Sequence, residues 1–302
     1  MLIDLVQLRT FVAVAEEQHL TRAAERLHIS QSAASAHVRS VEEYLGTRLF
    51  VRTNRSLELT KAGQLMLRQA KTLMNEAAQF TSFARELRGR MEGNLVVGSG
   101  SEPDTRIGEI IAALHASHPL LTVDLRMRPS GSARQGLRSG ELDVSLLLGR
   151  PADSGFTYHE LGKVQFRVAG PIAWRERIQN AGWGELGRMP WISPGSSSSA
   201  YSAMLDELFA HKGVELNTVA RWDNAALGRA LLGAGVGLML VRQEHADQGV
   251  REGTLAVSPL VQAEYSMWIA HQASRVDDPL IRAFVEATAV VWPGLKTWQP
   301  PA

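Results

Sequence analysis

The feature that most constrains the fold is a run of apolar and small residues in strict 4,3,4,3,4,3 spacing over residues 66–87. This spacing is the a/d pattern of a coiled coil over about three heptads. Alanine alternates there with larger side chains, so two backbones could approach closely. A lone helix of this length is marginal in water. The pattern predicts a dimerisation helix, with a long helix packed on its own chain as the alternative. The predicted seam consists of Met66, Ala70, Leu73, Ala77, Phe80, Ala84 and Leu87.

The composition is that of a globular protein with more than one unit. The chain has 302 residues, of which 45% are hydrophobic and 21% charged, enough for two or three ordinary cores. It has no cysteine, which excludes disulfides, thiolate zinc sites, cysteine nucleophiles and thiol redox sensing. It shows neither a cationic start followed by an apolar run nor a stretch as long as a membrane span. We therefore expect a soluble, cytoplasmic protein.

Charge is distributed unevenly along the chain. Residues 1–90 carry 13 Lys and Arg against 9 Asp and Glu, while the rest carries 19 against 22. The first part is therefore basic and the second slightly acidic. A basic part favours a polyanion as partner only weakly, because many proteins with such a bias bind no nucleic acid.

Three helices are predicted before the seam. Apolar residues recur at helical spacing over residues 5–15. Thr21 is a candidate N-cap for a second helix over 22–27, and Ser30 for a third over 31–45. Gly46 suits the end of the third helix. Two helices joined by a three-residue turn form a helix-turn-helix unit, whose second helix enters the major groove of DNA.

The surface of the third helix that faces away from its core carries the candidate DNA contacts. Gln31 suits an adenine edge. Ser32 and Ser35 suit phosphate or water-mediated contacts, and Arg39 suits phosphate neutralisation. Two β-like runs around residues 53–56 predict a basic wing hairpin. The candidate DNA-binding residues are Thr21, Gln31, Ser32, Ser35, Ala36, Arg39, Arg52 and Arg55.

After residue 91 the pattern changes to short apolar runs alternating with helical segments. This βαβ scheme predicts a parallel sheet, and a second series from Val164 predicts a second lobe. Open sheets of this kind bind ligands at the carboxyl ends of their strands. The residues in such positions, or in the Ser-rich run PGSSSS before a helix predicted over 199–212, are Ser99, Ser101, Glu102, Ser130, Ser132, Gly149, Ser196, Ser197, Ser198 and Asn224. The alternative role of the serines among them is to cap helices.

Four motifs carry a family resemblance. The segments FVAVAE (11–16), TRAAERLHISQ (21–31), LGTRLFVR (45–52) and LTKAG (59–63) resemble the N-terminal head of LysR-type transcriptional regulators in order and spacing. The segment AGVG (234–237), before an apolar strand, also fits this family. The chain departs from the family at Ser32, where proline is frequent, and at Ala36, where arginine is frequent, so its recognition helix is poor in arginine.

The resemblance implies an α/β multidomain protein. It consists of a winged helix-turn-helix over 3–61, a linker helix for dimerisation over 62–90, and an effector domain over 91–302. This domain resembles periplasmic binding proteins, with lobe one over 91–163 and 268–302 and lobe two over 164–267. The implied function is DNA-binding transcriptional regulation, not enzymatic catalysis, controlled by a small-molecule effector between the lobes. The implied partners are double-stranded operator DNA, further copies of the chain in a dimer or tetramer, and RNA polymerase if the chain is an activator.

Other readings of these segments remain as alternatives. The glycines at 233–237 end a helix and enter a strand, the reverse of a dinucleotide-binding motif. His115 and His118 lack further ligands at metal-binding spacing. No metal or cofactor is therefore expected. The competing functional hypothesis is a solute-binding protein or enzyme whose head serves only assembly, and salt-dependent binding to duplex DNA distinguishes the two.

Overall fold

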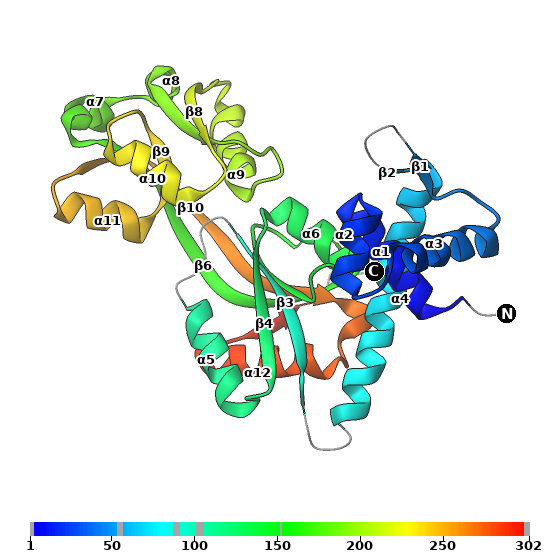
Figure 1. Ribbon diagram of the computed structural model, residues 1–302. Helices are drawn as coiled ribbons and strands as arrows, with labels where there is room; N and C mark the ends of the chain where they lie inside the picture. The colour runs from blue at the N-terminus through cyan, green and yellow to red at the C-terminus, as the bar shows by residue number, and fades with distance from the viewer. Residues whose placement is uncertain (1–2, 53–56, 87–90, 101–105, 152, 299–302) are drawn as a thin grey trace. The chain divides into compact units, whose positions relative to one another are not determined.

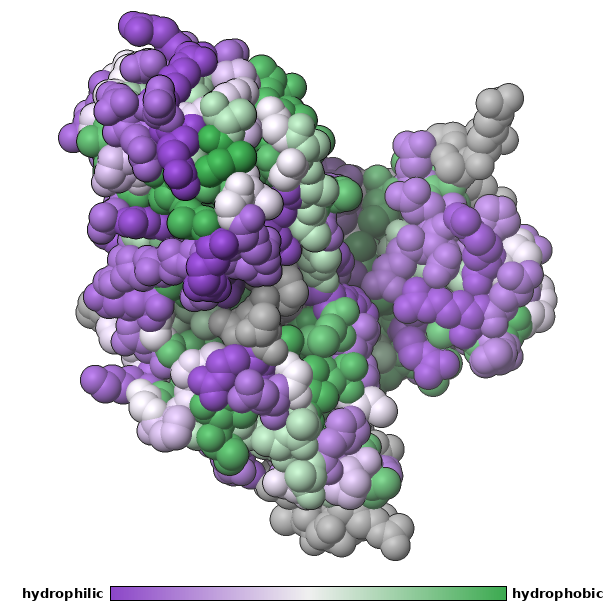
Figure 2. All heavy atoms as spheres, turned by 90° about the vertical axis from the view of Figure 1, so that its left-hand side faces the viewer, coloured by the Kyte–Doolittle hydropathy of each residue, from purple (hydrophilic) through white to green (hydrophobic). Residues whose placement is uncertain are grey.

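The chain divides into two compact units, residues 1–90 with 139–141, and residues 91–138 with 142–302 (Figure 1). A computed structural model describes residues 3–52, 57–86, 91–100, 106–151 and 153–298. Hydrophilic side chains cover most of the surface in Figure 2, with smaller apolar patches among them. No helix in the described part of the chain is both long and apolar enough to cross a membrane.

The first unit is a helical head with a short hairpin, followed by a long helix. Its elements are α1 (Leu5–Glu17), α2 (Leu20–Leu27), α3 (Gln31–Leu45), β1 (Phe50–Arg52), β2 (Leu57–Leu59) and α4 (Lys61–Glu86). Strands β1 and β2 pair antiparallel, as the predicted wing requires. The predicted basic tip at 53–56 lies outside the described residues.

Local signals at the helix ends explain α3 but not α2. The Ser30 Oγ accepts a hydrogen bond from the Ala33 amide at 3.1 Å, and Gly46 adopts the left-handed conformation with φ of 65°. Both predicted caps are therefore confirmed. The prediction for Thr21 is wrong, because α2 begins at Leu20 with His19 as its N-cap. Leu20 is partly buried against an apolar cluster of the head, and this contact favours one more helical residue before Thr21.

The long helix α4 packs partly on its own head. Ala70 is 4% exposed in a cluster with Phe11 and Val41, and Met66 packs against the same cluster. These two positions of the predicted seam therefore contact their own chain, because α1 and α3 cover this side of α4. Further along the helix, Leu73 and Phe80 are exposed. Leu87 and the side chain of Ala84 lie outside the described residues.

The second unit consists of two lobes joined by two long strands (Figure 1). Its helices are α5 (Ile107–Ser117), α6 (Ser130–Ser139), α7 (Arg175–Asn180), α8 (Trp183–Arg188), α9 (Ala200–Phe209), α10 (Ala225–Gly233), α11 (Gln243–Arg251) and α12 (Pro279–Val291). Its strands are β3 (Gly93–Ser99), β4 (Leu121–Met127), β5 (Val144–Leu148), β6 (Phe156–Pro171), β7 (Pro190–Pro194), β8 (Asn217–Trp222), β9 (Met239–Arg242), β10 (Leu255–Gln272) and β11 (Lys296–Trp298).

The sheet topology confirms the parallel βα pattern within each lobe and adds two crossing strands. Within the described residues, the main sheet runs β11-β6-β10-β5-β3-β4, with β9 also paired to β6. Strand β3 is parallel to β4 and β5, and β7 is parallel to β8. In contrast, β6 and β10 are antiparallel to each other and pass from one lobe to the other (Figure 1). The second lobe consists of α7 to α11 with β7 to β9, and α5, α6 and α12 belong to the first.

Several elements differ from what the sequence pattern predicts. The apolar runs at 254–257 and 265–270 predict two separate strands, but they form one strand, β10, with a register shift between Val257 and Gln262. Pro259 lies in this shift, where the missing amide hydrogen costs no ladder bond. Helices α8 and α11 and strand β11 had no prediction.

Strand β11 pairs antiparallel with β6 and also contacts a buried histidine pair. The Nε2 atoms of His159 and His271 are 3.1 Å apart, and the Nδ1 of His159 lies 3.0 Å from the Thr297 hydroxyl. The Nδ1 of His271 lies 2.9 Å from the Gln272 carbonyl and must donate to it. In the neutral pair, His271 therefore accepts through Nε2 from His159, which in turn accepts from Thr297.

Candidate functional site

The predicted DNA-reading face of α3 lies on the surface of the head. Gln31, Ser32, Ala36 and Arg39 are exposed, and Ser35 is half-buried. The opposite side of the helix packs into the head core through residues such as Ala34, Val38 and Val41. The helical periodicity therefore separates a buried apolar side from an exposed polar side, which begins at the N-terminus of α3.

Charged contacts hold α1, α2 and α4 together around this helix. In α1, Glu16 accepts hydrogen bonds from Arg26 of α2 at 2.8 Å and from Lys71 of α4 at 2.9 Å. Burial opposes ionisation of Glu16, but the two hydrogen bonds and the positive charges outweigh it and lower the pKa of this carboxyl. Glu16 is therefore ionised at neutral pH.

A second carboxylate connects α3 to the wing. Glu42 is 9% exposed, and its Oε1 accepts the amide hydrogens of Leu49 at 2.8 Å and Phe50 at 3.2 Å. Its Oε2 accepts from Arg48 at 3.0 Å. The recognition helix therefore fixes the start of β1, and the position of the wing depends on this side chain. Sequence reasoning missed Glu42, although an acidic residue among the apolar positions of a helix is a visible signal.

The remaining predicted DNA contacts are only partly described. Thr21 is half-buried in the first turn of α2. Arg52 ends β1, but its side chain is outside the described part, and Arg55 lies wholly outside it.

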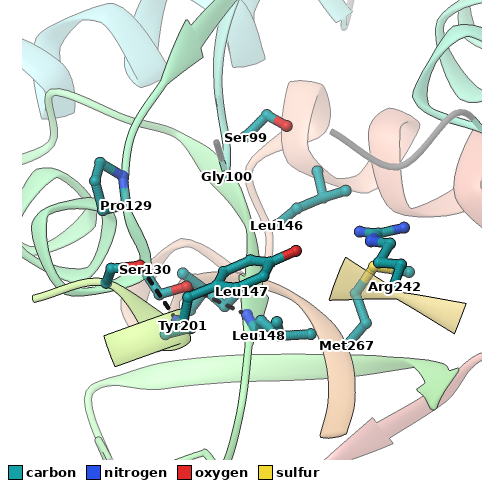
Figure 3. A pocket seen from close by; sticks show the side chains of 12 residues that line it. Ser99, Gly100, Pro129, Ser130, Leu146, Leu147, Leu148, Tyr201, Arg242 and Met267 are labelled. Carbon is teal, nitrogen blue, oxygen red and sulfur yellow. Dashed lines mark hydrogen bonds between the residues drawn. The ribbon is translucent and has the colours of Figure 1, made fainter. Parts of the chain in front are cut away.

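The second candidate site is a pocket between the lobes of the second unit. Figure 3 shows Ser99, Leu146, Tyr201 and Arg242 around it, from four different elements. The free space amounts to about 490 Å³, including the part open to solvent. The described residues that line it are Ser99, Gly100, Pro129, Ser130, Leu146, Leu147, Leu148, Ser199, Ala200, Tyr201, Arg242 and Met267.

The described part of the pocket lining carries positive charge. Arg242 supplies a guanidinium, and the described lining contains no carboxylate. Helices α6 and α9 both begin at the pocket, so amide hydrogens at two helix N-termini lie nearby. Ser99 is 8% exposed, and its hydroxyl has no hydrogen-bond partner within the described residues. Leucine and methionine side chains form the apolar part.

The structure brings together two of the predicted effector-binding residues, Ser99 and Ser130. The Ser130 Oγ lies 3.4 Å from the Leu148 amide, which donates to it (Figure 3). Glu102 and Ser101 lie outside the described residues.

The other predicted effector-binding residues do not line this pocket. The Ser132 hydroxyl donates to the Pro129 carbonyl, and Asn224 caps α10 by accepting from the Ala226 amide at 2.8 Å. Asn224 is therefore a helix cap, whereas Ser132 lies inside α6 and bonds to the carbonyl three residues before it. Gly149, Ser197 and Ser198 line a neighbouring, more open pocket instead, and Ser196 lines neither of the two.

Sequence reasoning missed Tyr201, Arg242 and Met267. Arg242 directly follows the apolar residues of β9, so the rule for strand ends could have found it. Tyr201 lies two residues after Ser199, which ends the serine run. The Ser199 Oγ accepts a hydrogen bond from the Tyr201 amide at 3.2 Å. Met267 lies in the middle of a crossing strand, where no local signal marks it.

Comparison with known proteins identifies both units. Residues 5–64 match the model of the bacterial regulatory helix-turn-helix protein, lysR family. Residues 88–291 match the LysR substrate binding domain.

Similar proteins include transcriptional regulators and solved structures. The chain is 34% identical to the regulator XapR of Escherichia coli (strain K12), over 56% of this chain and 58% of that protein. It is 31% identical to the regulator TtuA of Agrobacterium vitis, over 79% of this chain and 80% of that one. Full-length OxyR from Pseudomonas aeruginosa has the same fold, with a TM-score of 0.72, 22% identity, and coverage of 99% of this chain and 100% of that one. These matches are regulators, not enzymes, and the chain therefore belongs to the LysR family of DNA-binding transcriptional regulators with an effector-binding domain.

Proposed function

We propose that the chain binds its operator as a dimer through the exposed side of α3, and that a small anion bound between the lobes regulates it. The observation that carries the DNA-binding part is the polar surface of α3, where Gln31 and Arg39 are exposed on a helix whose other side is buried. Gln31 can pair with an adenine edge, and Arg39 can neutralise a phosphate. Thr21, Arg52 and Arg55 belong to the same proposal as further contacts.

Two variants separate base reading from phosphate contact. Gln31→Ala should lower discrimination between operator and scrambled duplex by about 1–3 kcal/mol and leave the salt dependence unchanged. Arg39→Gln should weaken binding to both duplexes and reduce the slope of log K against log salt by about 1. Fluorescence anisotropy with duplexes from the chain's own upstream region measures both. Gln135→Ala, an exposed glutamine in α6, is the control. Unchanged discrimination in Gln31→Ala would remove the base-reading role.

The exposed apolar side of α4 supports the dimer. Leu73 is 38% exposed and Phe80 is 77% exposed. An exposed phenylalanine on a long helix favours pairing with a second copy. Because Met66 and Ala70 pack on their own head, the proposed contact begins nearer Leu73 than the heptad pattern alone predicts.

Chromatography with light scattering tests this contact. Phe80→Glu should reduce the mass of the assembly in solution, whereas Ala78→Glu, also exposed but on another side of α4, should not. A mass unchanged in Phe80→Glu would refute the role of this side. A tetramer requires a second surface, and the edge strand β4 offers exposed Leu125 and Met127 for it.

The pocket supports an effector with an anionic group and an apolar part. Arg242 and the two helix N-termini can bind a carboxylate, and Leu146 and Met267 can contact a hydrocarbon part. Thermal shift with a panel of small carboxylates and their uncharged amides tests this class. We expect the carboxylates alone to stabilise the protein, and Arg242→Met to abolish the effect. Equal stabilisation by the amides would refute an anion-specific site.

The proposed mode of control is a population shift in the assembly. An effector can bias it only by binding two arrangements with different affinity. DNA bending or spacing preference should therefore change more than the structure of the head. Cytoplasmic location and, for an activator, contact with RNA polymerase belong to the same proposal.

A further inference from the structure

The two lobes meet at a backbone contact beside the pocket. Gly131, the second residue of α6 in the first lobe, donates its amide hydrogen to the Ser198 carbonyl in the second lobe at 3.0 Å. The first amides of a helix have no partner within the helix. A carbonyl from the second lobe therefore caps a helix of the first lobe, which is possible only while the lobes are close together.

The absence of a side chain at residue 131 permits this approach. A Cβ on Gly131 would lie 2.7 Å from the Ser198 carbonyl oxygen and 2.7 Å from the Ser198 Cβ, closer than real Cβ contacts. Gly131 does not have the positive φ that favours glycine elsewhere in the chain. Glycine also weakens a helix relative to alanine. The backbone conformation does not require glycine here, but the approach of Ser198 does.

The contact lies between two parts of the interlobe space. On one side is the proposed effector pocket with Ser99 and Tyr201. On the other is a more open pocket, which Ser198, Arg134 and Glu207 line. Ser130 and Ser199, the neighbours of the contact in sequence, line both pockets. Separation of Gly131 from Ser198 would therefore join the two spaces and open the effector pocket toward solvent.

We propose that Gly131 is a positioning residue that permits closure of the lobes, and that its bond to Ser198 fastens the closed form over the effector pocket. The biological purpose of this role rests on the proposed effector function. The contact between Gly131 and Ser198 does not depend on that proposal. A side chain at residue 131 displaces the second lobe, so the closed form becomes less populated as the side chain grows.

Distance measurements between spin labels on the two lobes test this proposal in the full chain. Because the chain contains no cysteine, His115→Cys in α5 and Asp247→Cys in α11 supply the sole two labelling sites per copy. Both residues are exposed. Mixing with excess unlabelled protein removes distances between copies. Gly131→Ala and Gly131→Leu are then compared with the otherwise unchanged labelled chain.

The matched control is Gly108→Leu. Gly108 is likewise the second residue of a helix in the first lobe, but a Cβ there would have nothing within 4 Å. We expect the mean distance between the labels to be larger in Gly131→Ala than in the chain with Gly131, and larger again in Gly131→Leu. In Gly108→Leu the distance should stay unchanged. An unchanged distance in both Gly131 variants, with duplex binding retained as proof of folding, would overturn the proposal.

A second readout separates this proposal from the effector proposal. Thermal shift with the carboxylate panel is measured on the same variants. If the distances increase but no carboxylate stabilises any form, the closure role stands and the anion proposal fails. If carboxylates stabilise the unaltered chain and both Gly131 variants equally, the fastening role over the pocket is refuted and the anion proposal stands.

Discussion

Removal of the Glu42 carboxylate should release the start of the wing from the recognition helix. In Glu42→Ala the amides of Leu49 and Phe50 lose the acceptor that they share. A hydrogen bond to a charged group contributes about 1.5–3 kcal/mol, so two such bonds give about 3–6 kcal/mol. The ion pair with Arg48 adds at most about 1 kcal/mol, because the Arg48 side chain is 80% exposed and solvent screens it.

Hydrogen exchange of the segment that contains Leu49 and Phe50 measures this local effect. About 3 kcal/mol corresponds to an approximately hundredfold increase in exchange rate, since each 1.4 kcal/mol is tenfold. In Glu42→Gln an amide oxygen can still accept both hydrogens, so we expect an increase nearer tenfold. DNA affinity should fall in the same order, because the wing and α3 no longer keep their relative position.

Glu43→Ala is the matched control, since Glu43 is the next residue of the same helix and is exposed. It should leave the exchange of the segment unchanged. If Glu42→Ala also leaves the exchange rate of this segment unchanged, the Glu42 carboxylate does not hold the wing and the reasoning is refuted. This result can be read without any loss of folding, because the exchange rates of the three variants are compared with one another.

Two further predictions concern a close approach in the head and a titration in the second unit. Gly63→Ala should abolish DNA binding and lower the melting temperature of the head in calorimetry, because its Cβ would overlap with the Leu49 carbonyl oxygen. Normal DNA binding by this variant would refute the prediction. Burial, with the neighbouring His271 as the smaller cause, lowers the pKa of His159 from 6.5 to about 4, and burial also lowers that of His271. Protons then bind the unfolded chain more readily, so stability should fall as the pH decreases from about 6.5 towards 4, by about 3 kcal/mol for His159 alone. Melting curves across this pH range should show a smaller loss of stability in His159→Gln than in the unaltered chain. Equal slopes of stability against pH in the two proteins would contradict the lowered pKa of His159.

Local signals in the sequence determine the head well, because its helices begin and end by short-range chemistry. Ser30 and Gly46 mark the ends of α3 through bonds to residues three or four positions away. Thr21 failed as a cap because the partial burial of Leu20, a tertiary effect, moved the helix start. The heptad positions Met66 and Ala70 contact their own head, which the pattern alone does not reveal, since a periodic apolar stripe does not tell which partner covers it.

The pocket was only partly predictable, because its lining comes from separate elements of the two lobes. Ser99 and Ser130 follow from the rule that ligands bind at strand ends. Tyr201 and Arg242 belong to the second lobe, and their distance from the first depends on how β6 and β10 cross. No local pattern contains that information. The sequence showed β10 as two strands around Pro259, so the continuous crossing strand was hidden.

Because β6 and β10 cross between the lobes, a bound effector has to supply a difference in binding free energy between two arrangements of the lobes. A ligand that contacts Ser99 on one lobe and Arg242 on the other stabilises only arrangements in which both face it. Reversal of a 1:99 population requires about 5.5 kcal/mol of differential affinity. One charge-assisted bond of about 1.5–3 kcal/mol and two or three hydroxyl contacts of about 0.5–1.5 kcal/mol each together give about 2.5–7.5 kcal/mol, which reaches this value in the upper part of the range. The contacts made across the cleft are therefore sufficient to switch the lobes only if the open form lacks most of them. Since the Gly131 bond to Ser198 exists only in the closed form, its loss should raise the effector concentration required for switching without changing any atom that contacts the effector.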